Sequence, residues 1–176
     1  MPQIIKTDAV VLRKKSLLDK DTVVTIFSKE YGKLRIIAKG IKKITSRRAA
    51  HVQTGNLVAT ELNVRGETFY LQNTTITSAF SQIKSDPEKI NYLYRFLFII
   101  DRILPEGQPE FAVYQTMLKA LIYLSKADRV TLDKFSAFLQ EILHDLGYGE
   151  APGGYNDIIR KIEEIIHEKV PEHVII

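Results

Sequence analysis

Lysine and arginine side chains crowd into residues 33–48, a stretch of the chain without a single acidic residue. The acid-free interval extends from Tyr31 to Thr60, although the chain carries 21 Asp and Glu residues. Ammonium and guanidinium groups bind phosphate oxygens through charge-assisted hydrogen bonds, so clustered cations are typical of a polyanion-binding site. The cations of this stretch are Lys33, Arg35, Lys39, Lys42, Lys43, Arg47 and Arg48.

The excess of positive charge belongs to the beginning of the chain. Residues 1–50 contain 13 basic and 4 acidic side chains, whereas residues 51–176 contain 12 basic and 17 acidic ones. A solvated charged loop normally mixes both signs, so this asymmetry favours a polyanionic partner for the N-terminal part. Because backbone cations read neither base nor sugar, the charge pattern leaves DNA and RNA equally open.

Residues that could perform catalysis or hold a metal are scattered. The four histidines, His51, His144, His167 and His173, lie in different segments without metal-ligand spacing. The chain has no cysteine, which excludes disulfides, thiol catalysis and Cys-ligated zinc. No nucleophile–base pair is recognisable, so we expect a protein that is not an enzyme and has no metal or cofactor.

The hydrophobic runs of the chain predict a cytoplasmic protein. The N-terminus becomes polar at once and lacks a small-residue cleavage site, so we expect no signal peptide. The most apolar run, residues 96–100, is far too short to span a bilayer and indicates a buried helix.

Five short runs are rich in Val, Ile, Thr and aromatic residues, which predicts five β-strands. These strands form the framework that holds the clustered cations. Short connections between most of these runs favour antiparallel neighbours and a small barrel or sandwich. In the third run, Leu34, Ile36 and Ala38 share one face, and Lys33, Arg35 and Lys39 share the other. The runs comprise residues 4–12, 21–27, 33–39, 57–64 and 68–77.

After residue 78 the hydrophobic period changes to about 3.6, which is typical of helices. Asp86 precedes Pro87 and predicts a capped helix start, and Thr131 predicts another. The last helix, 156–169, places five isoleucines on one stripe and ends before Pro171. The chain is therefore predicted to be α+β, with strands in residues 1–80 and a helical bundle in residues 81–176.

Several motifs stand in a recognisable order along residues 4–150. They are Thr7-x-Ala9-Val10-Val11-Leu12, Asp21, Phe27, Tyr31-Gly32-Lys33-Leu34-Arg35, Ala38-Lys39-Gly40, Ser46, Phe138, Ile142, Leu143 and Leu146-Gly147-Tyr148. This order resembles the RecO family of bacterial recombination mediators. The chain departs from many members in lacking a four-Cys zinc module after Tyr148.

The resemblance implies an OB-fold β-barrel in residues 1–80 and an α-helical domain in residues 81–176. It also implies a DNA-repair protein, cytoplasmic and associated with the nucleoid, that binds and anneals single-stranded DNA. Its partners would be RecR and, indirectly, RecA, which is loaded onto DNA coated by single-stranded DNA-binding protein (SSB). An OB surface stacks bases on aromatic rings, and the candidates for stacking are Tyr31, Phe69 and Tyr70. Among them we expect Tyr31, beside the turn glycine, to be exposed, whereas Phe69 and Tyr70 fit the core better.

A recombination mediator must contact SSB, whose acidic tail ends in an apolar residue. Such a tail needs an apolar pocket rimmed by cations. We expect that pocket near residues 131–146, with Lys134, Phe138 and Arg102 as candidate contacts. Two other functions stay open: a helical protein–protein adaptor with a basic OB module, and an OB-type RNA-binding factor.

Overall fold

The computed structural model describes residues 3–17, 21–41 and 46–173. The chain forms two compact units. The first contains the residues up to Ala79 together with Leu104–Pro109, and the second contains Phe80–Ile103 and the residues from Glu110 onward. None of the helices in the described residues is long and apolar enough to cross a membrane.

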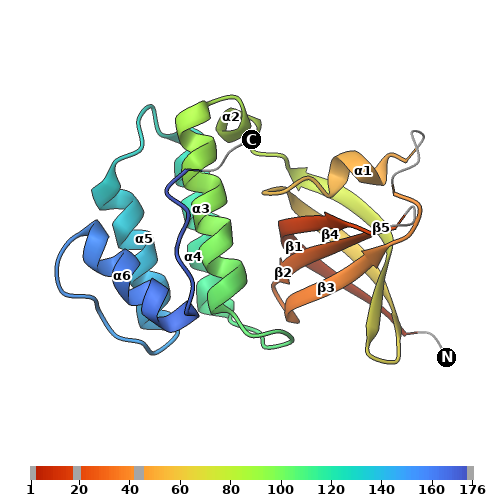
Figure 1. Cartoon of the computed structure of the whole chain (residues 1–176). Coiled ribbons are helices and arrows are strands. Elements are labelled where there is room, and N and C mark those ends of the chain that lie inside the picture. The colour runs from red at the N-terminus through yellow and green to blue at the C-terminus, as the bar shows by residue number, and fades with distance from the viewer. Residues whose placement is uncertain (1–2, 18–20, 42–45, 174–176) are drawn as a thin grey trace. The chain divides into compact units, whose positions relative to one another are not determined.

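The first unit is built on five strands, found in the described residues at nearly the predicted places (Figure 1). They form a closed barrel in the order β1-β2-β3-β5-β4. All neighbours pair antiparallel except β3 and β5, which meet in parallel at Ile36–Phe69 and Ile37–Tyr70. The strands are β1 (Gln3–Ser16), β2 (Thr22–Ser28), β3 (Gly32–Ala38), β4 (Leu57–Arg65) and β5 (Thr68–Ser78).

The alternation predicted for the third strand is confirmed. Leu34, Ile36 and Ala38 are buried in the barrel core, and Arg35 is exposed on the outer face. Removing the apolar side chains from water is the main contribution to the stability of this core. The outer face of β3 carries Arg35 and also the half-buried Ile37, which interrupts the polar groups.

Strand β1 is longer than predicted, since it pairs with β2 as far as Ser16, and this pairing shifts register between Val11 and Arg13. Before the shift, the odd-numbered residues Ala9 and Val11 lie in the core. After it, Arg13 is opposite Thr25 and Lys15 is opposite Val23, on the outer face. Such a β-bulge inserts one residue and redirects the side chains that follow.

The connection between β3 and β4 contains the short helix α1 (Arg48–His51). Arg48 donates hydrogen bonds to the carbonyl oxygens of Leu71 (3.2 Å) and Lys39 (3.1 Å). The His51 ring Nδ1 lies 2.9 Å from the carbonyl oxygen of Thr74. These contacts attach α1 to β5 and to the turn that follows β3.

The segment Leu104–Pro109 belongs to the same compact unit as the barrel. Its Gly107 N–H donates to the Lys33 carbonyl oxygen (2.9 Å), and Glu106 forms a parallel bridge with Lys33. A Cβ atom added to Gly32 would lie 2.1 Å from the carbonyl oxygen of Gln108. The beginning of β3 therefore accommodates this segment only because residue 32 is glycine.

The second unit is helical, as the period of 3.6 predicted (Figure 1). Asp86 caps α3 by accepting hydrogen bonds from the N–H groups of Glu88 (2.9 Å) and Lys89 (3.2 Å). Thr131 caps α5 through the N–H of Lys134 (3.3 Å). The helices of this unit are α2 (Ser81–Lys84), α3 (Pro87–Ile103), α4 (Phe111–Lys126), α5 (Leu132–Asp145) and α6 (Tyr155–Ile166).

The predicted end of the last helix, at residue 169, is wrong. Helix α6 ends at Ile166, because His167 adopts a left-handed conformation (φ 55°). Ile158 and Ile162 are fully buried, and Ile159, Ile165 and Ile166 are half-buried. The isoleucine stripe is thus the packing face of the helix.

Candidate nucleic-acid interface

A cleft of about 470 Å³ lies over the outer face of β1, β2 and β3. It is called the basic cleft here, since three cations and one carboxylate line it. Its remaining lining is apolar or hydroxylic. The lining residues are Arg13, Lys15, Leu17, Val23, Thr25, Arg35, Ile37, Glu67 and Thr68.

Strand pairing arranges these side chains in two rows across the sheet. Arg13 is opposite Thr25, which is opposite Arg35. The next row runs from Lys15 to Val23 and Ile37, and continues to Tyr70 on β5. Directly opposed residues in an antiparallel pair have Cβ atoms about 5 Å apart. The three cations of the cleft therefore lie around the apolar side chains of Val23 and Ile37.

Tyr70 extends the second row with a half-buried aromatic ring. The Lys39 Nζ lies 4.9 Å from the ring centroid, and the Arg65 guanidinium carbon lies 5.6 Å from it. Both distances fall within the range of cation–π attraction. One aromatic platform and two further cations thus adjoin the basic cleft.

The seven predicted cations are not equivalent in the structure. Arg35 lines the basic cleft, and its Nε lies 2.5 Å from Glu106 Oε1. Lys39 lies at Tyr70, and Arg47 is exposed just before α1. Lys42 and Lys43 lie outside the described residues. Arg35 and Lys39 are thus brought to the cleft and its edge.

Two of the predicted cations have surroundings that the sequence did not reveal. Lys33 is only 8% exposed, at the end of β3 where Leu104–Pro109 pairs with it. Arg48 directs its guanidinium to the carbonyl groups of Leu71 and Lys39. Both positions connect parts of the barrel unit.

The predicted stacking residue Tyr31 lies in the turn between β2 and β3 and is 36% exposed. Its N–H donates to Ser28 Oγ (3.1 Å). This turn follows Ser28 and precedes Gly32, whereas the cleft is lined by Val23, Thr25, Arg35 and Ile37. Tyr31 is therefore not among the residues of the basic cleft.

Sequence reasoning missed Arg13 and Lys15. Strict alternation from Ala9 and Val11 would place both side chains inside the barrel, and only the bulge turns them outward. The available signal was the run Arg13-Lys14-Lys15 itself, because three consecutive cations cannot continue a buried face. Lys14, between them, donates to Gln53 Oε1 (2.9 Å).

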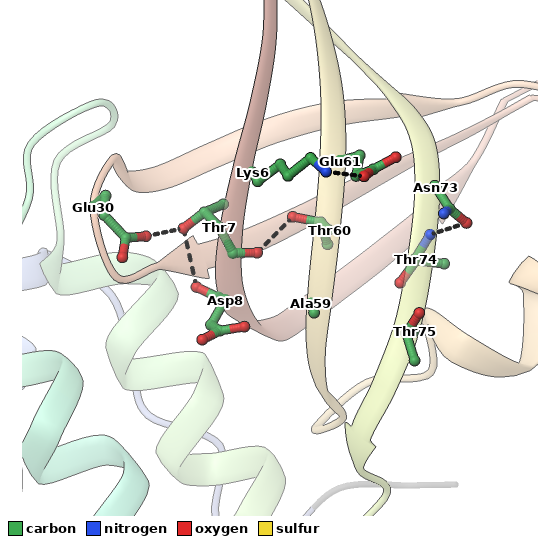
Figure 2. Close-up of a pocket in the computed structure, with 10 residues that line it drawn as sticks. All are labelled: Lys6, Thr7, Asp8, Glu30, Ala59, Thr60, Glu61, Asn73, Thr74 and Thr75. Atoms are coloured by element: carbon green, nitrogen blue, oxygen red, sulfur yellow. Dashed lines mark hydrogen bonds and ion pairs between the residues drawn. The ribbon is translucent and has the colours of Figure 1, made fainter.

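A second cleft, of about 340 Å³, lies over β1, β4 and β5 (Figure 2). Asp8, Glu30 and Glu61 line it with Lys6 as the one cation, so it is called the acidic cleft. Lys6 Nζ lies 2.7 Å from Glu61 and lowers the pKa of that carboxyl through the hydrogen bond. Thr7 donates to Glu30. The remaining carboxylates repel phosphates, so the acidic cleft is unsuited to a polyanion.

The predicted partner residues of the helical unit contact their own unit. Arg102 donates hydrogen bonds to Glu168 and Asp101, each at 2.7 Å. The hydrogen bond to Glu168 raises the pKa of the Arg102 guanidinium. Phe138 is buried, and the Lys134 Nζ lies 5.2 Å from its ring centroid. Lys134 itself is exposed on α5. Among the described residues of the chain, no group of three or more His, Asp and Glu could hold a metal ion.

Comparison with known proteins links both units to one family. The family model Recombination protein O N terminal matches residues 1–80, and Recombination protein O C terminal matches residues 84–150. Three similar relatives each carry the name DNA repair protein RecO. The protein of Acetivibrio thermocellus is 30% identical over 146 residues, which cover 82% of this chain and 57% of the relative.

The other two relatives match with similar extent. The protein of Geobacter metallireducens is 28% identical over 143 residues, 81% of this chain and 58% of its own length. That of Symbiobacterium thermophilum is 27% identical over 145 residues, 82% of this chain and 57% of its own length. The chain therefore spans somewhat more than half the length of the relatives it matches.

Proposed function

The chain belongs to the RecO family, and from this premise we propose that it is a non-enzymatic protein that binds and anneals single-stranded DNA in recombinational repair. The observation that carries the proposal is the basic cleft with Tyr70 at its edge. The cleft offers cations for phosphates, and the ring offers a surface for a base. Single-strand-binding surfaces combine these two elements.

We further propose that the barrel is an OB fold. Five strands close in the order 1-2-3-5-4, with a short helix between the third and fourth. OB folds bind oligonucleotides on the face of strands 2 and 3 and on the loops that follow strands 1 and 4. The basic cleft has this position, since Leu17 follows β1 and Glu67 lies between β4 and β5.

Binding is driven by the release of counterions from the phosphates. Each phosphate neutralised on a single strand contributes about 0.7 to the slope of log affinity against log salt. Arg13, Lys15, Arg35, Lys39 and Arg65 lie in or beside the cleft, so a slope of about −3 to −4 is expected. Because these cations contact the phosphates and not the bases, the affinity for a single strand is independent of its base sequence. Screening the charge of two strands on one surface also favours their annealing without ATP.

A mediator role requires partners, and we propose a RecR-like protein, the SSB tail and, indirectly, RecA. For the tail, the exposed Lys134 above the buried Phe138 is the candidate contact on α5. Titration of a labelled tail peptide against wild type and Lys134→Glu tests this. Loss of peptide binding with unchanged single-strand affinity supports the contact, and equal binding by both proteins refutes it.

The decisive experiment is a fluorescence anisotropy titration with single-stranded DNA, duplex DNA and RNA of equal length, at several salt concentrations. We expect single-stranded DNA to bind with the slope given above. The double variant Arg13→Ala/Lys15→Ala should flatten the slope by about 1.4. The matched control is Lys126→Ala/Arg129→Ala, which removes two exposed cations from the helical unit.

Three outcomes would contradict the proposal. Absence of single-strand binding at low salt favours the helical adaptor. Stronger binding of RNA than of DNA favours an RNA-binding factor. Equal flattening of the slope by the two double variants would show that the basic cleft is not the binding surface.

A further inference from the structure

Arg35, which lines the basic cleft, forms an ion pair with Glu106. Arg35 occupies the row that runs across the basic cleft from Arg13 through Thr25. Its Nε lies 2.5 Å from Glu106 Oε1, so a carboxylate is placed where a DNA phosphate would bind. Carboxylate and phosphate accept the same guanidinium hydrogen bonds.

The backbone of the barrel unit fixes the position of Glu106. Strand β5 pairs with β3 only at Ile36 and Ile37, which leaves the edge of β3 near Lys33 without β5. Leu104–Pro109 takes this edge through the Lys33–Glu106 bridge and the hydrogen bond from Gly107 N–H to the Lys33 carbonyl oxygen. The segment is therefore held by its main chain, whether or not Glu106 keeps its charge.

The ion pair itself can exchange. The side chains of Arg35 and Glu106 are 61% and 48% exposed, so solvent reaches both. Exposed ion pairs contribute little net free energy, because water and salt compete with them. A phosphate that enters the basic cleft can thus replace the carboxylate on Arg35 without unfolding any element.

From these observations we infer that Glu106 is a built-in competitor of phosphate at Arg35, and that it limits how tightly the basic cleft holds a single strand. This inference rests on the proposed function. When a strand binds, the Glu106 carboxylate leaves Arg35 and takes up a solvent cation, which offsets one of the cations released from the DNA. The segment stays paired with β3, so the carboxylate remains next to Arg35 and favours release of the strand.

The test compares single-strand affinity and salt slope in wild type, Glu106→Gln and Glu67→Gln. Glu67 also lines the basic cleft, so its variant removes the same charge from the same cleft and is the matched control. Glu106→Gln should bind about two- to fivefold more tightly at low salt. Its slope should be steeper by up to about 0.7. Thermal unfolding of each variant checks that the fold is retained.

A second pair of variants distinguishes competition for Arg35 from the electrostatic repulsion that any carboxylate near the cleft exerts on DNA. In an Arg35→Ala background, Glu106→Gln should have no more effect than Glu67→Gln. Hydrogen exchange should show the Gly107 amide equally protected with and without DNA, because only the side chain moves. An effect of Glu106→Gln that persists without Arg35, or a wild-type affinity and slope for Glu106→Gln, would overturn the inference alone. No binding by any of these proteins would overturn both the inference and the proposed function.

Discussion

Lys39 reaches from the turn after β3 to the ring of Tyr70 on β5, with its Nζ 4.9 Å from the ring centroid. Arg65, next to the turn between β4 and β5, lies 5.6 Å from the same centroid. A nucleotide base that stacks on a ring face covered by one of these cations displaces that cation. The displaced side chain then lies beside the phosphate of the same nucleotide, so stacking and charge neutralisation are expected to occur together.

Tyr70 should therefore contribute to single-strand affinity through its ring. We expect Tyr70→Ala to weaken binding by about 1–3 kcal/mol, which is the usual contribution of one stacked base. Tyr70→Phe should bind like wild type, because it keeps the ring. Anisotropy titration measures both, with Tyr31→Ala as the control for an aromatic outside the basic cleft. Equal losses for Tyr31→Ala and Tyr70→Ala would place the stacking surface at the turn between β2 and β3 as well.

The neighbours Arg47 and Arg48 should give opposite results. Arg48→Ala removes hydrogen bonds to two carbonyl groups and should lower the free energy of unfolding by about 1–2 kcal/mol. Arg47 is exposed, so Arg47→Ala should change stability by less than about 0.5 kcal/mol. Arg47 is predicted from the sequence to contact DNA, so a strand that continues beyond the cleft to α1 would make Arg47→Ala flatten the salt slope by about 0.7. Urea unfolding and salt titration measure the two quantities, and a stability loss in Arg47→Ala would contradict this division.

Gly32 and Gly66 form a matched pair for the contact with Leu104–Pro109. Both have positive φ, 70° and 58°, so alanine costs about 1–2 kcal/mol at either position. Only at Gly32 would the new Cβ meet the Gln108 backbone, whereas at Gly66 nothing lies within 4 Å. Overpacking should add another 1–3 kcal/mol or so to Gly32→Ala. Equal unfolding midpoints for the two variants would show that the segment moves aside freely.

Glu141 should make the stability of the helical unit depend on pH. The Lys119 ammonium and the Thr116 hydroxyl donate hydrogen bonds to Glu141 and lower its pKa. A lowered pKa stabilises the fold above the ordinary glutamate value of about 4.3, and this contribution disappears as pH falls through the folded-state pKa. Because the pair is largely exposed, the contribution stays below about 1 kcal/mol.

Glu141→Gln isolates this contribution. Wild type should be more stable than the variant at pH 7, and the difference should shrink as pH falls below about 4.3 and vanish once pH lies below the lowered folded-state pKa. Urea unfolding at several pH values measures it. A constant difference across this range would show that Glu141 acts through its shape and not its charge.

Local signals in the sequence were sufficient for much of the fold. Alternation placed Leu34 and Ile36 in the core, and the cap residues Asp86 and Thr131 located two helix starts, because these effects involve residues close together in the chain. The surroundings of Lys33 and Arg48 depend on distant partners. Lys33 is covered where Leu104–Pro109 pairs with β3, and Arg48 reaches a carbonyl on β5. No pattern within residues 33–48 indicates these contacts with distant segments.

The bulge between Val11 and Arg13 makes the backbone of β1 as important as its composition. If the same residues continued in regular register without the bulge, Arg13 would lie opposite Val24 and face the barrel interior together with Lys15, while Lys14 would lie opposite Val23 on the outer face. The cleft would exchange two cations for one, although no charged residue had been lost. The charge of the cleft therefore depends on one backbone irregularity as well as on the side chains that line it.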